Sequence, residues 1–256
     1  MTRLFAILGD PVAQVRSPSL FNDRFCGRSI DAVMIPIHVG AGDFTSVLAT
    51  LRYVRNLDGL VVTVPHKPAA ASAARPCSRR VEIAQAANAL RPIPGGWECD
   101  LFDGEGFAIG LQASGVSVTG KNVSIVGVGG AGAAIAVALL DRDANVTLFD
   151  LDRPRAQRTA ARLSSIFSRN VDIGLPSSWA DIVVNATPLG MREGDPFPFD
   201  LDALGKGAIV ADIIMNPPMT PLLHEAARRG FSIQAGRYML DNQLDSLWSF
   251  FRLPNP

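Results

Sequence analysis

A lysine at the end of a short apolar stretch is the first candidate for acid–base chemistry. The stretch Val-Thr-Val-Pro-His-Lys (62–67) runs from β-branched residues into Pro65 and ends at Lys67. Proline lacks a backbone donor and therefore ends a strand. The residues after it lie at the carboxyl end of that strand, where open α/β sheets bind their ligands. Lys67 could therefore contact a ligand, although this stretch alone favours the alternative that it is a plain surface charge.

A glycine-rich turn in 123–132 is the second candidate, and its chemistry is phosphate binding. The spacing G-x-G-x-x-G allows a tight turn, close approach of the backbone to a pyrophosphate, and close packing of helix on strand. The helix N-terminus that follows adds partial positive charge. An ordinary structural turn is the weaker alternative, because the motif lies in a complete strand–turn–helix–strand unit. The expected cofactor-binding residues of this turn are Gly127, Gly129, Gly130, Ala131 and Gly132.

An acidic segment after the next strand bears on the choice of cofactor. Asp150 lies 18 residues after the last glycine of the turn, and its carboxylate can accept both hydrogen bonds of an adenine ribose diol. Asp150 and Asp152 would repel a 2′-phosphate, whereas Arg153 or Arg155 could contact one. We therefore expect NAD as the cofactor, with NADP as the disfavoured alternative.

Expected strands and helices alternate along almost the whole chain and would hold these residues in place. Continuously apolar, β-branched runs are typical of parallel strands covered on both faces, and alanine-rich helical patterns lie between them. The expected strands are 4–9, 32–39, 59–64, 123–128, 145–150, 181–186 and 208–214. Helical patterns include 155–167 and 220–230, the second ending at Gly230. The fold class that this alternation predicts is α/β with parallel sheets.

Six segments together resemble the shikimate dehydrogenase family along nearly the whole chain. They are VRSPSLFN (15–22), VTVPHK (62–67), QAANAL (85–90), LFDGEG (101–106), NATPLGM (185–191) and GRYMLDNQ (236–243). The resemblance implies two domains joined through a helix at 106–115. An N-terminal α/β substrate-binding and catalytic domain, residues 1–103, is completed by the C-terminal helical segment 236–256. Residues 104–235 form a Rossmann-type nucleotide domain with a parallel sheet.

The same resemblance implies the residues of the site. Lys67 and Asp103 form a pair that relays the hydroxyl proton of a secondary alcohol while the cofactor accepts the hydride. The implied substrate-binding residues are Ser17, Thr63, Asn88 and Gln243, and the further cofactor-binding residues are Thr187, Ile213 and Gly236. Each polar residue also has a structural reading as a turn, cap, strand or exposed helix residue, and His66 is expected to be a bystander.

Four departures from the family pattern point to altered specificity. One is Leu101 and Phe102 before Asp103, where the family often has Asn-Thr. Val15 stands where a serine that binds the substrate carboxylate is expected, and Met215 replaces a tyrosine. The residues 150–152 replace the Asn-Arg-Thr of NADP enzymes. We expect an NAD-dependent dehydrogenase of a shikimate-, quinate- or aminoshikimate-like acid, within shikimate and quinate metabolism or aromatic amino acid biosynthesis. The alternatives are a non-catalytic dinucleotide-binding sensor or regulator, and a folate- or amino-acid-directed dehydrogenase.

Composition narrows the range of partners and compartments. The 24 basic and 24 acidic residues cancel, which argues against nucleic acid or an anionic membrane as partner and leaves a small-molecule substrate. We expect a monomer or homodimer. Cys26, Cys77 and Cys99 are an odd set without the spacing of a disulfide framework or a metal site, and no export signal is visible. These features favour a reducing cytoplasm and no bound metal.

Overall fold

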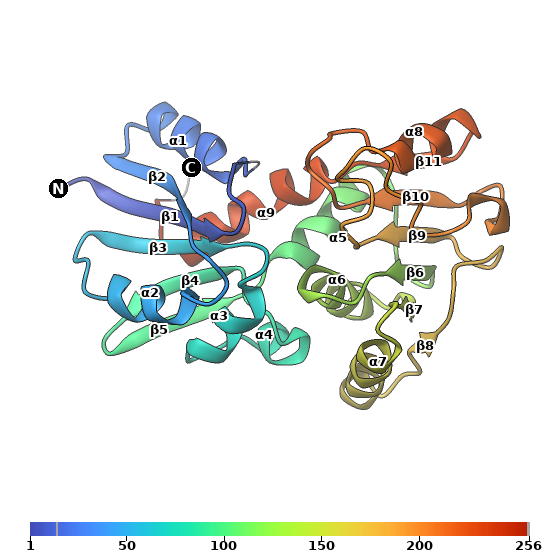
Figure 1. The fold of residues 1–256 in the computed structure, drawn as a ribbon, viewed down its shortest axis with the longest axis horizontal. Helices are drawn as coiled ribbons and strands as arrows, with labels where there is room; N and C mark the ends of the chain where they lie inside the picture. The colour runs from blue at the N-terminus through green and yellow to red at the C-terminus, as the bar shows by residue number, and fades with distance from the viewer. Residues whose placement is uncertain (14, 255–256) are drawn as a thin grey trace. The chain divides into compact units, whose positions relative to one another are not determined.

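The computed structural model describes residues 1–13 and 15–254, and the chain divides into two compact units (Figure 1). Unit 1 comprises Met1–Phe102 and Leu244–Pro256, and unit 2 comprises Asp103–Gln243. The chain therefore enters unit 2 at Asp103 and returns to unit 1 after Gln243.

Unit 1 is a five-stranded sheet with helices on both faces. The strand order is β2-β1-β3-β4-β5, in which β1 pairs parallel with β2 and β3 whereas β4 and β5 are antiparallel. Its elements are β1 (Arg3–Gly9), α1 (Ser17–Gly27), β2 (Ala32–His38), α2 (Phe44–Leu51), β3 (Leu57–Val62), α3 (Lys67–Ala73), α4 (Arg79–Ala84), β4 (Ala89–Ile93) and β5 (Gly96–Asp100).

The core of unit 1 explains why the C-terminal segment belongs to it. Phe21 of α1 and Trp248 of α9 (Arg237–Phe250) join Phe5 of the sheet in one buried apolar cluster. Aromatic side chains dominate this cluster, and each buries a large apolar area. Elsewhere in the unit α2 and α3 lie side by side (Figure 1), and the Trp97 indole donates to the Leu48 carbonyl of α2 at 3.1 Å.

Unit 2 is a six-stranded, wholly parallel sheet of the Rossmann type. The order β11-β10-β9-β6-β7-β8 reverses direction between β6 and β9, which is the switch point where such sheets bind nucleotides. Its elements are α5 (Asp103–Ala113), β6 (Asn122–Val126), α6 (Gly130–Leu140), β7 (Asn145–Phe149), α7 (Arg153–Phe167), β8 (Asp172–Ile173), β9 (Ile182–Asn185), β10 (Ile209–Asp212), α8 (Pro221–Arg228) and β11 (Ser232–Gln234), with a 3₁₀ turn at Leu201–Ala203. The expected α/β fold is confirmed.

The structure also departs from the expected elements. The antiparallel hairpin of β4 and β5, with its turn between Ile93 and Gly96, was not among the expected strands. The short strands β8 and β11 were not expected, because two or three residues give too little periodicity to recognise. Gly230 adopts a positive φ of 85° just after α8, as its expected role at the helix end requires. Within residues 1–13 and 15–254, no helix is long and apolar enough to cross a bilayer.

Candidate active site

The carboxyl end of β3 places Lys67 at the start of a helix. The Thr63 amide donates to the Leu8 carbonyl at 2.9 Å, and the His66 amide donates back to the Thr63 carbonyl at 2.9 Å. This turn ends the strand, and Lys67 is the first residue of α3. The Thr63 methyl group lies so close to Gly9 that a Cβ on that glycine would come within 2.4 Å of it. The turn that presents Lys67 is therefore packed directly on the end of β1.

His66 has a structural role in this turn. Its ring is 2 % exposed, its Nε2 lies 2.7 Å from the Val39 carbonyl oxygen, and it stacks on Phe44 with ring centroids 4.6 Å apart. A buried ring that is hydrogen-bonded and stacked fixes the backbone beside it. These contacts of His66 thus help to fix the backbone at Lys67, the next residue.

Asn88 lies at the same end of the sheet as Lys67. The Ala87 amide donates to the Lys67 carbonyl at 2.9 Å, and the Val62 amide donates to the Asn88 carbonyl at 2.8 Å. The Asn88 side-chain oxygen accepts from the Phe102 amide at 2.9 Å, and the residue is 2 % exposed. The structure therefore brings Thr63, Lys67 and Asn88 together. Ser17, 4 % exposed, is the first residue of α1.

Asp103 and Gln243 occupy the two points at which the chain enters and leaves unit 2. Asp103 begins α5 and is 3 % exposed, and Gln243 lies in α9 and is 4 % exposed. A Cβ on Gly106 would come within 2.2 Å of the Met239 carbonyl oxygen and 2.8 Å of the Gln243 Cβ. Glycine at this position lets α5 and α9 touch, so the helix that starts with Asp103 packs beside Gln243.

The glycine turn leads from β6 into α6 as expected. Gly127 has a φ of 95°, and a Cβ on Gly132 would come within 2.0 Å of the Gly127 carbonyl oxygen. A Cβ on Gly129, by contrast, would meet nothing within 4 Å, and no side chain caps the N-terminus of α6. An open, uncapped helix N-terminus of this form fits a pyrophosphate.

The Asp150 carboxylate holds the glycine turn to the segment that follows β7. One carboxylate oxygen accepts from the Val128 amide at 2.8 Å, and the other accepts from the Asp152 amide at 2.9 Å. The Arg155 guanidinium lies 3.5 Å from Asp150 and 3.2 Å from the Asp152 carboxylate. Leu151 between them is 88 % exposed. The Arg155 guanidinium is therefore already paired with two carboxylates.

A buried polar network that sequence reasoning missed fixes the ends of β9 and β10. Asp212 accepts from the Ile214 amide at 2.9 Å, from the Asn185 side chain at 3.1 Å and from the Thr220 hydroxyl at 2.8 Å. Asn185 in turn accepts from the Thr187 hydroxyl at 2.7 Å. Burial raises the pKa of Asp212, and these three hydrogen bonds only partly oppose the shift. In the sequence, Asn185 and Asp212 each end an apolar run, and this pattern is the signal that could have revealed the network.

The expected cofactor residues meet at this edge of the unit 2 sheet. A Cβ on Gly127 would lie 2.8 Å from the Thr187 methyl group, and one on Gly236 would lie 2.6 Å from the Ile213 carbonyl carbon. Asn185 and Asp212 are register partners in β9 and β10. The carboxyl ends of β6, β9 and β10 and the start of α9 thus lie close together.

Comparisons with known proteins agree with this arrangement. Residues 7–90 match the family model described as the shikimate dehydrogenase substrate binding domain. The chain is 36 % identical over 254 residues to a shikimate dehydrogenase (NADP(+)) of Acidiphilium cryptum, covering 94 % of this chain and 87 % of that protein. The chain belongs to the shikimate dehydrogenase family. The resemblance inferred from six segments is confirmed.

Two solved structures of the family are similar along their whole length. The shikimate 5-dehydrogenase of Thermus thermophilus, in complex with NADP(H) and shikimate, has a TM-score of 0.88 at 25 % identity, covering 100 % of this chain and 96 % of that one. The quinate dehydrogenase of Corynebacterium glutamicum, in complex with NAD, has a TM-score of 0.86 at 26 % identity, covering 98 % and 94 %. This chain is accordingly an oxidoreductase that acts on a CH–OH group with a nicotinamide dinucleotide.

The residues that depart from the family pattern lie in different surroundings. Val15 is partly buried against the aromatic core of unit 1, and Met215, also half-buried, follows β10 in unit 2. A surface hollow of about 510 Å³ in unit 1 is lined by Asp100, Phe102, Asp245, Ser246, Ser249 and Phe250, and contains none of the expected site residues. In the described part of the chain, no three His, Cys, Asp or Glu side chains gather as a metal site.

Proposed function

We propose that this member of the shikimate dehydrogenase family oxidises a secondary alcohol of a cyclic polyol acid with NAD. The acid is of the shikimate, quinate or aminoshikimate kind. The observation that carries the proposal is the position of Lys67, at the start of α3 and directly after the carboxyl end of β3. It lies within the region that matches the substrate-binding family model. A strand end that presents an ammonium group suits removal of a hydroxyl proton.

The proposed acid–base pair is Lys67 and Asp103. Lys67 takes the hydroxyl proton as the alcohol becomes a carbonyl, and Asp103 orients the ammonium group and accepts a hydrogen bond from a neighbouring hydroxyl. The bound nicotinamide supplies the hydride acceptor. Ser17, Thr63, Asn88 and Gln243 are proposed to bind the substrate, because Ser17, Asn88 and Gln243 are polar groups at most 4 % exposed and Thr63 is in the turn before Lys67.

The proposed preference for NAD rests on the residues after β7. Two carboxylates, Asp150 and Asp152, and the exposed Leu151 replace the groups that would hold a 2′-phosphate, and Arg155 is paired with both carboxylates. Relatives such as the shikimate dehydrogenase (NADP(+)) of Acidiphilium cryptum argue against the expectation that NADP is disfavoured. The Corynebacterium glutamicum quinate dehydrogenase binds NAD. The proposed preference for NAD therefore rests on the charged residues Asp150, Asp152 and Arg155 of this chain.

The proposed substrate class rests on Val15 and Met215. Losing two polar contacts to the substrate, each worth roughly 1–3 kcal/mol, would lower kcat/KM for shikimate by about 10²-fold or more. We propose a quinate- or aminoshikimate-like acid as the better substrate.

The proposed division of labour follows the two units. In this proposal, residues 1–103 and 236–256 bind the substrate, and residues 104–235 bind the dinucleotide. The boundaries of the two compact units differ from these ranges by one residue at the first crossing, and by eight residues at the second. We propose a reducing cytoplasm as the compartment, and a monomer or homodimer as the assembly.

A panel of cyclic polyol acids with NAD and with NADP, monitored by cofactor absorbance at steady state, tests the proposal. The expected result is turnover of at least one acid other than shikimate, with the higher kcat/KM for NAD. Efficient oxidation of shikimate, or a higher kcat/KM with NADP, would contradict the substrate or the cofactor assignment respectively. Tight NAD binding in calorimetry without turnover of any acid would instead favour a sensor.

A further inference from the structure

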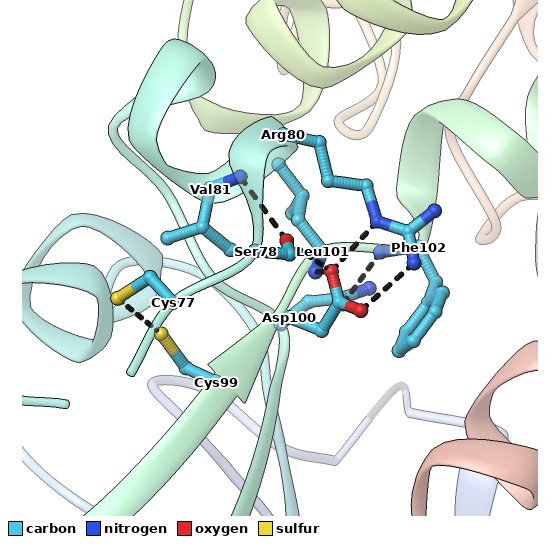
Figure 2. Close-up of polar contacts among 9 residues, drawn as sticks. Cys77, Ser78, Arg80, Val81, Cys99, Asp100, Leu101 and Phe102 are labelled. Atoms are coloured by element: carbon cyan, nitrogen blue, oxygen red, sulfur yellow. Dashed lines mark hydrogen bonds and ion pairs between the residues drawn. The ribbon is translucent and has the colours of Figure 1, made fainter. Parts of the chain in front are cut away.

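Two of the three cysteines lie side by side in unit 1 although they are distant in sequence. Cys77 precedes α4, and Cys99 is in β5, 22 positions later. Their sulfur atoms are 2.8 Å apart (Figure 2). Both thiols are free in the structure, and Cys26 is exposed elsewhere.

The backbone around the pair has the spacing that a disulfide needs. Cys77 and Cys99 form a parallel bridge, in which the Cys99 amide donates to the Pro76 carbonyl at 3.0 Å and the Ser78 amide donates to the Cys99 carbonyl at 3.2 Å. Paired strands lie about 4.8 Å apart, within the range of about 4.4–6.8 Å that disulfides span between Cα atoms. The sulfur atoms would only have to approach to roughly 2.05 Å.

The two thiols differ in access and in charge environment. Cys77 is half-buried, and the Arg75 guanidinium donates to its sulfur at 3.3 Å. The Cys77 thiol in turn donates to the Ala74 carbonyl at 3.1 Å. Cys99 is 2 % exposed, and burial raises the pKa of its thiol. Cys77 is therefore the sulfur that an external reagent meets first.

We propose that Cys77 and Cys99 are a redox modification site that forms a reversible intramolecular disulfide with a small disulfide oxidant such as oxidised glutathione. The Cys77 thiolate attacks one sulfur of the oxidant, forming a mixed disulfide and releasing one glutathione thiolate. Cys99 then loses its proton and attacks the Cys77 sulfur, which releases the second glutathione. Two cysteine thiols are oxidised, and the oxidant is reduced to two glutathione molecules.

The new bond would reinforce a connection that the fold already makes. Beside the cysteines, the Asp100 carboxylate accepts from the Ser78 hydroxyl at 2.5 Å and from the Arg80 guanidinium at 2.6 and 2.8 Å (Figure 2). The disulfide therefore joins two segments that are already held in place, and it closes a loop of about 20 residues. We expect the melting temperature to rise by roughly 5–10 °C, mainly because the unfolded chain is constrained.

The test is equilibration of the full chain in glutathione buffers of rising oxidation, followed by intact mass, thiol counting after denaturation and peptide mapping. The expected product has lost two hydrogen atoms and retains one thiol, with the Cys77 and Cys99 peptides linked and Cys26 still open to alkylation. Its melting temperature rises, and a dithiol reductant reverses both changes.

Two single variants separate this outcome from non-specific oxidation. Cys26→Ser should still lose two thiols and gain the same thermal shift. Cys77→Ser should keep the Cys99 thiol reduced and show no shift with oxidant. Three thiols remaining in the wild type, a linkage that includes Cys26, or a glutathione adduct at Cys77 that persists would each overturn the proposal.

Discussion

The carboxyl ends of β3 in unit 1 and β6 in unit 2 both lead through a turn into a helix, but they offer a ligand different groups. After β3 the turn is closed by the His66 amide and presents the side chain of Lys67 at the first position of α3. After β6 the turn contains Gly127 and Gly129, and no side chain caps the backbone at the N-terminus of α6. In the proposed function, the end of β3 acts through a side chain and the end of β6 acts through the main chain.

This difference predicts different responses to substitution. A side chain that performs chemistry can be removed with little change in the fold, because packing is provided by neighbours such as His66 and Phe44. A main-chain site depends on the absence of side chains, so a single added methyl group can disturb both packing and binding. The experiments below test whether the two strand ends differ in this way.

Replacing Lys67 should have the largest effect. Lys67→Ala is expected to lower kcat by about 10²–10⁴-fold, because the hydroxyl proton loses its acceptor. The dissociation constant for NAD, measured by calorimetry, should change less than about tenfold, which corresponds to about 1.4 kcal/mol. Lys206→Ala, at an exposed lysine of unit 2, is the matched control and should leave both quantities unchanged. A much weaker affinity for NAD in Lys67→Ala would show that the lysine belongs to the cofactor site.

Adding polar groups at the substrate side should change substrate choice. Val15→Ser with Met215→Tyr is expected to raise kcat/KM for shikimate by up to about 10²-fold, if each new contact contributes roughly 1–3 kcal/mol. Val15→Ala is the matched control, since it removes the same contact with the aromatic core without adding a hydroxyl. Equal kcat/KM for shikimate in the double variant and the wild type would contradict the proposal that Val15 and Met215 determine substrate choice.

The two glycines of the nucleotide turn should fail in different ways. Gly132→Ala places a methyl group within 2.0 Å of the Gly127 carbonyl, so the melting temperature should fall by an amount equivalent to about 1–3 kcal/mol of overpacking. Gly129→Ala meets nothing within 4 Å, so stability should be kept while NAD affinity falls by about tenfold or more. Both variants are compared by thermal unfolding and NAD calorimetry. Undiminished NAD affinity in Gly129→Ala would place the pyrophosphate elsewhere.

Restoring the NADP signature should shift cofactor preference more modestly. The triple variant Asp150→Asn, Leu151→Arg and Asp152→Thr is expected to raise the NADP-to-NAD ratio of kcat/KM by about 10-fold or more, through one charge-assisted contact with the 2′-phosphate. Threonine keeps a hydroxyl to cap α7, where the Asp152 carboxylate now accepts from the Arg155 amide at 3.0 Å. Asp172→Asn, an exposed carboxylate of β8, is the control. An unchanged NADP-to-NAD ratio of kcat/KM would show that residues 150–152 do not determine cofactor choice.

The smallest effect is expected in the pH dependence of stability at Asp212. Its pKa is raised by burial, so between the unfolded value of about 4 and the folded value the unfolded state has lost a proton that the folded state retains. The stability that Asp212 contributes is therefore greatest below about pH 4 and falls as the pH rises. Compared with Asp212→Asn, which is neutral at every pH, the wild type should lose melting temperature from pH 4 upward. A difference that is constant with pH would contradict the raised pKa.

Much of the fold and of the candidate site could be predicted from the sequence. The seven expected strands are all present within a few residues, because long apolar runs between turn residues have a clear local signal. Lys67 at a strand end and the glycine turn before α6 could be recognised for the same reason. Their chemistry depends on a few consecutive residues, and local conformation is determined mainly by such neighbours.

The order of the elements, the glycine turn and the polar residues that end strands could thus be inferred from local patterns in the sequence. Which of these residues come into contact depends on the tertiary structure. The antiparallel β4–β5 hairpin, the hydrogen bond between Asn185 and Asp212, and the contact between Cys77 and Cys99 depend on strand order and register. Residues paired across strands are distant along the chain, so no local pattern records their contact.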